Sequence, residues 1–469
     1  MHAPYGPGWP ALFALLSPVV PLSYGGMIHV AVLFGCAYFV GLYVLLRLLT
    51  GRPAWAAAGT LFALFLHLYN GLPFLWPLWR FPSLTVIRRP LDVWVLLALL
   101  MHLRTGRTAW AALAGALTGA AVVMVTDSGL YLAGVVAVYL AWWAWTRGRR
   151  GVPAVVAAGV AGCAALVAGL GFVSRWTLLE PRFWQRWLEP LSDGADGFTA
   201  LPLAGVRYHY RGGGVPEGPT ILLFGVVATV YLGVAAWALV KSVHRRAGGE
   251  ELLLGIVSLY GLASLVHFLG RSDPLNLPHP LVPFAIVLTG LAALAHRGAG
   301  RPGSVRAVPA LAAGVAVAAL FANPGFRAYP GLLQSAWNGI PEDGRCLVEA
   351  PVRDACALPP DLAPAVATFR EVVEELRRVD AAGGTVALLD ADDAAYYLAA
   401  GIPPWGPYSP LLTNLFHMSQ VDEVVAKLVD ERPEFVLIRP LGDSSYLADV
   451  RERLFRVLER DYVPVRTLG

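Results

Sequence analysis

Charged side chains that border long apolar segments are the residues of this sequence best suited to chemistry. The clearest group is HFLGRSDPLNLPH, in which Arg271, Asp273 and His279 follow an apolar segment directly. A guanidinium group in this position can hold a phosphate through two parallel hydrogen bonds. In the alternative interpretation Arg271 and Asp273 form an ion pair and the prolines simply end a helix. In both cases the charges need partners, because ionisable groups are costly at the edge of a hydrocarbon layer.

A second basic group, Arg88 and Arg89, stands before the apolar segment that follows Pro90. Asp92 is the expected local partner of these arginines, about one helical turn further along the chain. The two guanidinium groups can bind a substrate phosphate, and they can equally bind the anionic head groups of membrane lipids. The sequence favours neither ligand.

Asp127, in the string VTDSGLYL, separates two apolar segments with almost no loop between them. In the simpler interpretation its carboxylate caps the N-terminus of the following helix. In the other interpretation it positions a sugar hydroxyl or a polar neighbour at the mouth of a cavity.

The polar segment 174–218 combines aromatic and charged residues in the string EPRFWQRWLEP. Trp184, Trp187 and Leu188 share one helical face there, a pattern that predicts a helix in the head-group plane of a membrane. This helix either anchors the chain or covers a substrate cavity. In the second case His209 and Arg211 would offer groups that bind sugar or phosphate.

Several classes of chemistry have no motif in this sequence. It contains no G-x-x-x-x-G-K-[ST], no dinucleotide fingerprint after a strand, no H-E-x-x-H and no G-x-S-x-G. We therefore identify no cofactor and expect no metal site, and the need for a divalent ion stays open. Only Lys241 and Lys427 among the 36 basic residues are lysine, and we expect no nucleic-acid partner.

Two of the four cysteines, Cys346 and Cys356, lie close together in the string CLVEAPVRDAC. If this part of the chain faces an oxidising compartment, a local disulfide is expected. The alternative is a pair of unlinked thiols.

The elements that must position these residues are predominantly apolar. Of the 469 residues 57% are hydrophobic and 14% charged, and the mean hydropathy is +0.58. The apolar residues form runs of about 18–23, the length of helix that crosses about 30 Å of hydrocarbon. The sequence thus predicts a polytopic, all-α membrane bundle of about ten helices, surrounded by membrane lipids. The predicted spans are 27–49, 53–72, 84–103, 108–126, 129–146, 152–173, 219–240, 251–270, 280–296 and 305–322.

Basic residues gather in every second connection between these spans, for example at Arg104 and Arg107. Short cytoplasmic loops carry an excess of lysine and arginine, which places these connections in the cytoplasm. The alternate segments, about 70–89, 174–218 and 270–280, then face outward. We expect a multi-pass protein of the bacterial cytoplasmic (inner) membrane.

The pattern changes after residue 322, which divides the chain into a transmembrane domain, 1–322, and a soluble domain, 323–469. Val386–Leu389 and Phe435–Ile438 predict buried strands, and amphipathic helices surround them. The order helix, strand, helix, helix, strand, helix predicts a three-layer α/β domain with a largely parallel sheet. The topology places this domain on the extracytoplasmic side.

Together these features resemble the GT-C superfamily of polytopic membrane glycosyltransferases. The resemblance rests on YGPGWPAL from Tyr5, on VTDSGLYL and on GRSDPLNL, and on the plan of short inner and long outer connections. It implies transfer of a sugar from a polyprenyl-phosphate donor to a glycan, lipid or protein acceptor of the cell envelope. The lipid phosphate would leave, held by Arg271, while an aspartate activates the acceptor hydroxyl.

The superfamily's first helix and acidic outer loop would precede Tyr5, where this sequence has four residues. We therefore expect an N-terminally truncated chain and assign no catalytic residue. Two other functions fit the composition: a lipid or glycan transporter or flippase, and a non-catalytic assembly subunit. A transporter would more often show internal repeats and charges at the membrane midplane.

Overall fold

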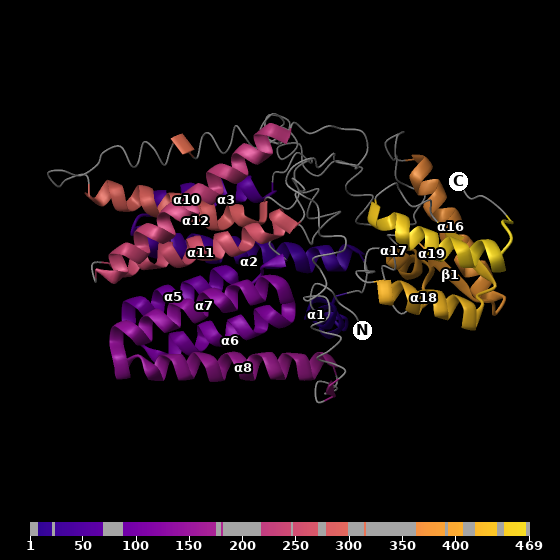
Figure 1. Cartoon of the computed structure of the whole chain (residues 1–469), viewed down its shortest axis with the longest axis horizontal. Helices are drawn as coiled ribbons and strands as arrows, with labels where there is room; N and C mark the ends of the chain where they lie inside the picture. The colour runs from indigo at the N-terminus through magenta and orange to yellow at the C-terminus, as the bar shows by residue number, and fades with distance from the viewer. Residues whose placement is uncertain are drawn as a thin grey trace. The chain divides into compact units, whose positions relative to one another are not determined.

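A computed structural model describes most of the helical parts of the chain (Figure 1). It divides into two compact units, which are treated separately below. The larger unit comprises Tyr5–Leu179 and Leu201–Trp337, and the smaller unit comprises Met1–Pro4, Glu180–Ala200 and Asn338–Gly469. The described residues are 8–20, 24–68, 88–174, 180–181, 217–244, 247–270, 278–298, 314–315, 363–389, 393–406, 418–438 and 445–465.

The larger unit is built from helices alone in the part of the chain that the structure describes. In chain order they are α1 (Gly8–Leu16), α2 (Tyr24–Thr50), α3 (Pro53–Leu68), α5 (Asp92–Thr105), α6 (Thr108–Met124), α7 (Thr126–Arg147), the 3-10 turn η3 (Gly148–Arg150), α8 (Val152–Ser174), α10 (Glu217–Val243), α11 (Gly249–Gly270) and α12 (Pro278–Gly298).

Six helical segments among the described residues are long and apolar enough to cross a membrane. They are His29–Thr50, Thr126–Arg150, Val152–Ser174, Leu223–Val243, Gly249–Val266 and Pro280–Arg297. Each overlaps one of the ten predicted spans, and together they indicate a membrane protein. Of the other predicted spans, two correspond to the shorter apolar helices α3 and α6 and one to α5, while 305–322 lies outside the described residues except for 314–315.

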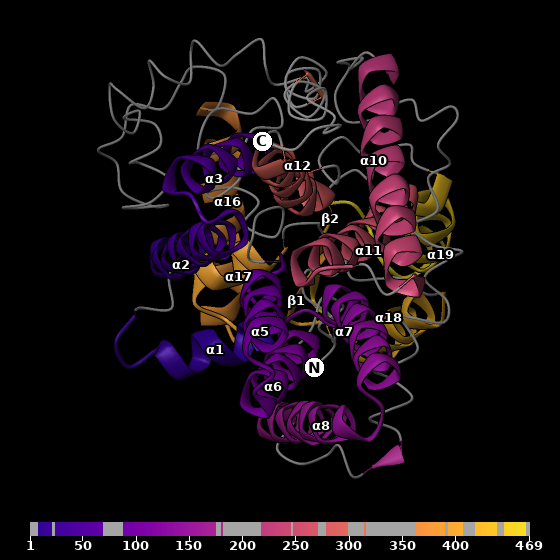
Figure 2. The same ribbon diagram turned by 90° about the vertical axis from the view of Figure 1, so that its left-hand side faces the viewer.

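Helix α5 is the most enclosed of the short helices. It contacts α2, α6 and α11, which surround it in the view along the bundle (Figure 2). Its 14 residues cover about 21 Å, less than the thickness of the hydrocarbon core. The helix begins at Asp92, later than the predicted residue 84, and residues 88–91 form a turn. Pro90 explains this start, because a proline disfavours helical backbone at the residue before it, Arg89.

Helices α6 and α8 lie side by side (Figure 2), and small residues form their contact. A Cβ atom on Gly115 would lie 2.0 Å from the carbonyl oxygen of Ala158, and one on Gly119 would lie 2.2 Å from that of Gly162. Neither position therefore has room for a side chain. This spacing of small residues every fourth position is a common way for apolar helices to pack closely.

The smaller unit combines helices with a two-stranded sheet in its described residues. Strand β1 pairs in parallel with strand β2, with Val386 opposite Phe435 and Leu389 opposite Ile438. Both strands lie at their predicted positions. The elements are α16 (Ala363–Ala381), β1 (Val386–Leu389), α17 (Asp393–Ala400), α18 (Met418–Glu431), β2 (Phe435–Ile438) and α19 (Ser445–Asp461).

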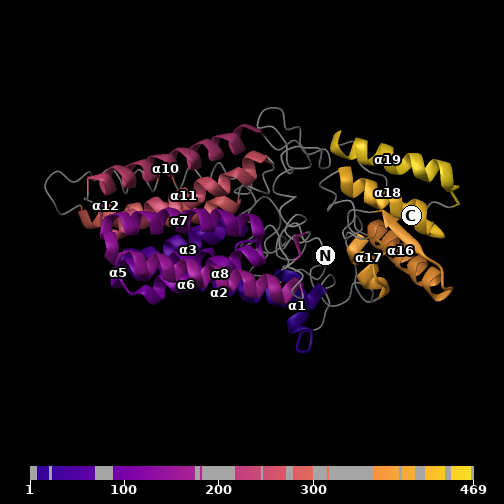
Figure 3. The ribbon, with the colours of Figure 1, turned by 60° about the horizontal axis from the view of Figure 1, so that its bottom comes forward.

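The two faces of this sheet pack against different helix pairs, α16 with α17 and α18 with α19. The two helices of each pair contact each other (Figure 3). Val386 and Leu388 pack with residues of α16 and α17. Ala387 and Leu389 point to the opposite face, as alternation along a strand requires, and pack with residues of α18 and α19. The sheet is thereby covered on both faces. Strand β1 is buried as predicted, but the prediction of a buried strand is wrong for β2, which is partly buried and ends at the exposed Ile438.

Tyr397 of α17 occupies the edge of β1 that faces away from β2. Its buried hydroxyl group accepts a hydrogen bond from the N–H of Leu388 at 3.0 Å and donates one to the carbonyl oxygen of Val386 at 3.2 Å. Strand edges with unsatisfied backbone groups are unfavourable when buried, so this tyrosine replaces part of a third strand.

Candidate functional site

Arg88 forms an ion pair that joins the turn before α5 to the first turn of α7. One guanidinium nitrogen, Nη2, lies 3.1 Å from Oδ2 of Asp127, and the two side chains are 12% and 22% exposed. Ser128 strengthens the connection, because its hydroxyl donates to the carbonyl oxygen of Arg88 at 2.7 Å and its N–H donates to Asp127. The pair is thus held in place yet remains partly accessible.

Arg89 turns to a different helix, α11. Its Nη1 donates to the hydroxyl of Ser264 at 2.8 Å, and its guanidinium carbon lies 5.7 Å from the ring centroid of Tyr260. Arg89 and both partners are buried. Tyr260 and Ser264 are four residues apart and therefore lie on the same face of α11.

Asp92 supplies the negative charge near Arg89. Its Oδ2 accepts a hydrogen bond from the hydroxyl of Tyr260 at 3.0 Å, and its Oδ1 accepts one from the N–H of Val93 at 2.6 Å. Tyr38 of α2 is a further hydrogen-bond partner, and Arg89 interacts with the carboxylate electrostatically. Buried charges persist only with such partners.

We call this set the arginine cluster. It can bind anions through Arg88 and Arg89, and it can accept protons or hydroxyl groups at Asp127. Its members come from three helices and from the turn that precedes one of them. They are Arg88, Arg89, Asp92, Asp127, Tyr260 and Ser264.

The structure bears on two of the sequence-based expectations. Asp92 was expected to be the local partner of the adjacent arginines; Arg89 does interact with its carboxylate electrostatically, whereas Arg88 pairs with Asp127. Of the two interpretations of Asp127, the N-terminal cap does not apply, because Val125 is the capping residue of α7 and makes no side-chain cap hydrogen bond. Asp127 instead lies inside the first turn, where the helix dipole favours a carboxylate.

The side chains of the other candidate residues are not among those that the structure describes. His279 lies in α12, where its side chain is not among the described ones. The remaining predicted residues fall outside the described residues, together with most of segment 174–218. They are Arg271, Asp273, His209, Arg211, Cys346 and Cys356.

Three residues of the site were not predicted. Tyr260 and Ser264 on α11 and Tyr38 on α2 contact charged groups that are distant in sequence. The sequence does contain a signal for Tyr260 and Ser264, because the string SLYGLAS places these two polar groups one turn apart within an apolar helix. Polar side chains in such helices usually face the bundle interior.

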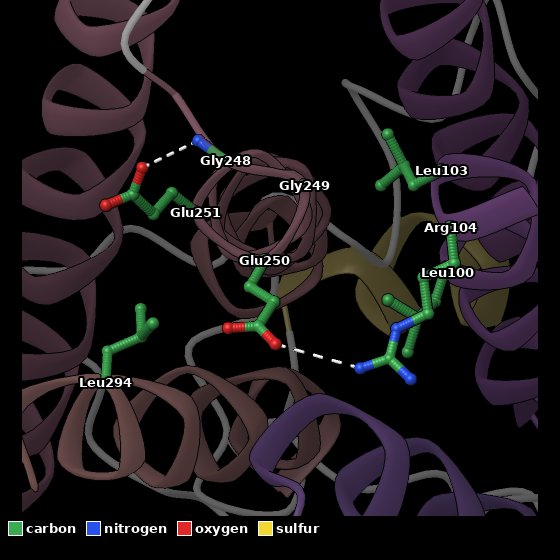
Figure 4. A pocket seen from close by; sticks show the side chains of 8 residues that line it. All are labelled: Leu100, Leu103, Arg104, Gly248, Gly249, Glu250, Glu251 and Leu294. Carbon is green, nitrogen blue, oxygen red and sulfur yellow. Dashed lines mark hydrogen bonds and ion pairs between the residues drawn. The ribbon is translucent and has the colours of Figure 1, made fainter. Parts of the chain in front are cut away.

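A second charged set lies at the opposite end of α5 and α11. These helices run antiparallel, so Arg104 near the end of α5 lies 3.7 Å from Glu250 in the first turn of α11. Arg297 of α12 also contacts Glu250, and Lys241 of α10 contacts Glu251. An open hollow of 560 Å³ lies here (Figure 4). Its lining residues are Leu100, Leu103, Arg104, Gly248, Gly249, Glu250, Glu251 and Leu294.

Comparison with known proteins gives no family to which this site can be assigned. No family model, curated protein or solved structure matches the chain. Within the described residues, no group of three or more histidine, cysteine, aspartate or glutamate side chains is placed to hold a metal ion. The function must therefore be argued from the arginine cluster itself.

Proposed function

We propose that this chain is a membrane glycosyltransferase that takes a sugar from a polyprenyl-phosphate donor and transfers it to a cell-envelope acceptor. The donor phosphate binds at the arginine cluster. The observation that carries this proposal is the partly exposed pair of Arg88 and Asp127, with Arg89 and Asp92 buried behind it. A partly exposed guanidinium group with a second guanidinium group buried behind it suits a phosphate ligand.

Charge balance explains how a phosphate enters the site. The cluster contains two guanidinium groups and two carboxylates, so it is neutral without substrate. An arriving phosphate displaces Asp127 from Arg88, because phosphate can accept two hydrogen bonds from a guanidinium. Ser264 and Tyr260 keep Arg89 in position meanwhile, so its positive charge adds to the attraction.

The proposed reaction uses these groups as follows. The acceptor hydroxyl attacks the anomeric carbon of the sugar, the bond from that carbon to the phosphate oxygen breaks, and the polyprenyl phosphate leaves. Negative charge develops on the leaving phosphate, where Arg88 stabilises it. The proton of the hydroxyl passes to a carboxylate, and Asp127 is the partly exposed carboxylate of the cluster.

The position of the charges favours this function over transport. Arg89 and Asp92 are the buried arginine and carboxylate of the described part of the larger unit, and both lie at one end of α5. Transporters more often carry such groups at the membrane midplane. We place the arginine cluster and the smaller unit, as a soluble α/β domain, on the extracytoplasmic side of a bacterial cytoplasmic membrane, where Arg271 is the further expected phosphate ligand.

The test is sugar transfer by the full chain reconstituted in liposomes with radiolabelled polyprenyl-phosphate sugars. Arg88→Gln is expected to lower the rate by about 100-fold, as loss of one transition-state hydrogen-bond donor does. Arg52→Gln is the matched control, because Arg52 contacts His296 at the opposite end of the bundle. The proposal is wrong if the wild-type chain transfers no sugar, or if both variants lose activity equally.

A further inference from the structure

The hollow between α5, α11 and α12 is amphipathic. Leu100, Leu103 and Leu294 form its apolar part, while Arg104 and the carboxylates of α11 form its charged part. Figure 4 shows Arg104 and Glu250 extending toward each other from different helices. Its 560 Å³ falls within the range of small-ligand cavities, about 300–1,000 Å³.

The two carboxylates of the hollow already have close partners. Glu250 accepts hydrogen bonds from both terminal guanidinium nitrogens of Arg297, at 3.0 and 2.5 Å. Glu251 pairs with Lys241 and accepts a hydrogen bond from the N–H of Gly248 at 2.8 Å. Both negative charges are thus balanced by groups from neighbouring helices.

Arg104 is the surplus cation of this set. Its Nη2 lies 3.7 Å from Glu250, beyond hydrogen-bond distance, and donates to the carbonyl oxygen of Leu48. Its side chain is 39% exposed. Counting the contacts above, three cations face two carboxylates, so this charged set carries one net positive charge, and Arg104 is the cation of the set that lines the hollow.

We infer that this hollow binds the phosphate group of an anionic membrane phospholipid. Arg104 holds the phosphate, and the first part of an acyl chain lies on the leucines. The apolar helices α11 and α12 each begin or end at this hollow, so it lies at the depth where lipid phosphates are found. A free phosphate ion would gain nothing from the apolar part, which favours the lipid. This site is independent of the proposed sugar transfer.

Lipid retention by the full chain tests this inference. The protein is placed in nanodiscs of phosphatidylcholine doped with phosphatidylglycerol, extracted in mild detergent, and examined by native mass spectrometry. We expect retained phosphatidylglycerol, and Arg104→Gln is expected to reduce its affinity about fivefold, the effect of one basic group at a lipid surface. Arg378→Gln, which removes an exposed partner of Glu375 in the smaller unit, is expected to change nothing.

Two further variants distinguish loss of the lipid site from misfolding of the protein. Arg104→Lys keeps the charge and is expected to retain the lipid, while Glu251→Gln removes a negative charge and is expected to bind it more tightly. Equal retention of phosphatidylcholine and phosphatidylglycerol would overturn the inference, as would unchanged binding in Arg104→Gln. Equally strong binding of soluble glycerol phosphate would show that the ligand is not a lipid.

Discussion

At the scale of single residues, the arginine cluster contains charges that are stable only as a set. Arg89 and Asp92 are both buried, and Tyr260 contacts both of them. Removal of water from two such groups is costly, and their mutual attraction offsets this cost only with good geometry and further hydrogen bonds. The cluster therefore predicts a large loss of stability when one charge is removed.

Asp92→Ala is expected to lower the free energy of unfolding by about 3–5 kcal/mol, because Arg89 then loses the nearby negative charge. Thermal unfolding in detergent measures this loss. The double variant Arg89→Met, Asp92→Leu is expected to recover most of the stability, since an apolar pair of similar volume often substitutes well. The double variant should nevertheless transfer no sugar. A double variant as unstable as Asp92→Ala would contradict this interpretation.

Tyr397 gives a residue-scale prediction for the smaller unit. Tyr397→Phe leaves the N–H of Leu388 and the carbonyl oxygen of Val386 without the hydroxyl that contacts both, and is expected to cost about 1–3 kcal/mol. Hydrogen exchange at Leu388 should become faster. Tyr462→Phe is the control, because its buried hydroxyl has no hydrogen-bond partner among the described residues. Equal effects of the two substitutions would argue against the role of Tyr397.

The same hydroxyl predicts a dependence on pH. Burial raises the pKa of Tyr397 above its ordinary value of 10.0. The folded state therefore holds this proton more tightly than the unfolded state, so the contribution to stability is complete below pH 10 and is lost as the pH rises through the raised value. Unfolding of wild type and Tyr397→Phe across alkaline pH should converge. Curves that stay parallel would contradict this prediction.

The sequence predicted parts of the site for a clear reason. Arg88, Arg89 and Asp127 were recognisable because charged residues beside apolar segments are rare and need partners. Their pairing was not recognisable, since Arg88 and Asp127 are 39 residues apart and Arg89 and Ser264 are 175 apart. Such contacts depend on how helices pack, which local spacing does not contain.

At the scale of elements, local patterns located helices and strands better than their ends. Both strands lie at the predicted residues because short apolar runs between amphipathic helices are typical of parallel strands, although only β1 is buried along its whole length. The start of α5 was placed too early because apolarity was given more weight than Pro90. Length alone also misleads, since an enclosed helix such as α5 need not match the thickness of a membrane.

The close contact between α6 and α8 can be tested by substitution. Gly115→Leu is expected to force the helices apart, because its Cβ would lie 2.0 Å from the carbonyl oxygen of Ala158. We expect a loss of about 1–3 kcal/mol or more, the usual effect of overpacking. Gly159→Leu on α8 is the control, since nothing lies within 4 Å of its Cβ position. Comparable melting temperatures for both variants would show that this contact does not hold the helices together.

At the scale of the whole molecule, the two ends of the larger unit differ in chemistry. One end carries the arginine cluster, and the other carries Arg104, Arg297 and Lys241 with their glutamates. Basic residues near helix ends favour the cytoplasm. The proposed function depends on this orientation, because the outer face is where a polyprenyl-phosphate donor would meet an envelope acceptor.

Labelling of single cysteines in intact cells tests the orientation, after the four native cysteines are replaced by serine. Ser17→Cys reports on the end with the arginine cluster, because α1 contacts the end of α6 at Met124, and Thr105→Cys reports on the other end. A membrane-impermeant maleimide should label the first in intact cells and the second only after permeabilisation. The reverse pattern would place Arg88 and Asp127 in the cytoplasm, and sugar transfer at the outer face would then have no site at this cluster.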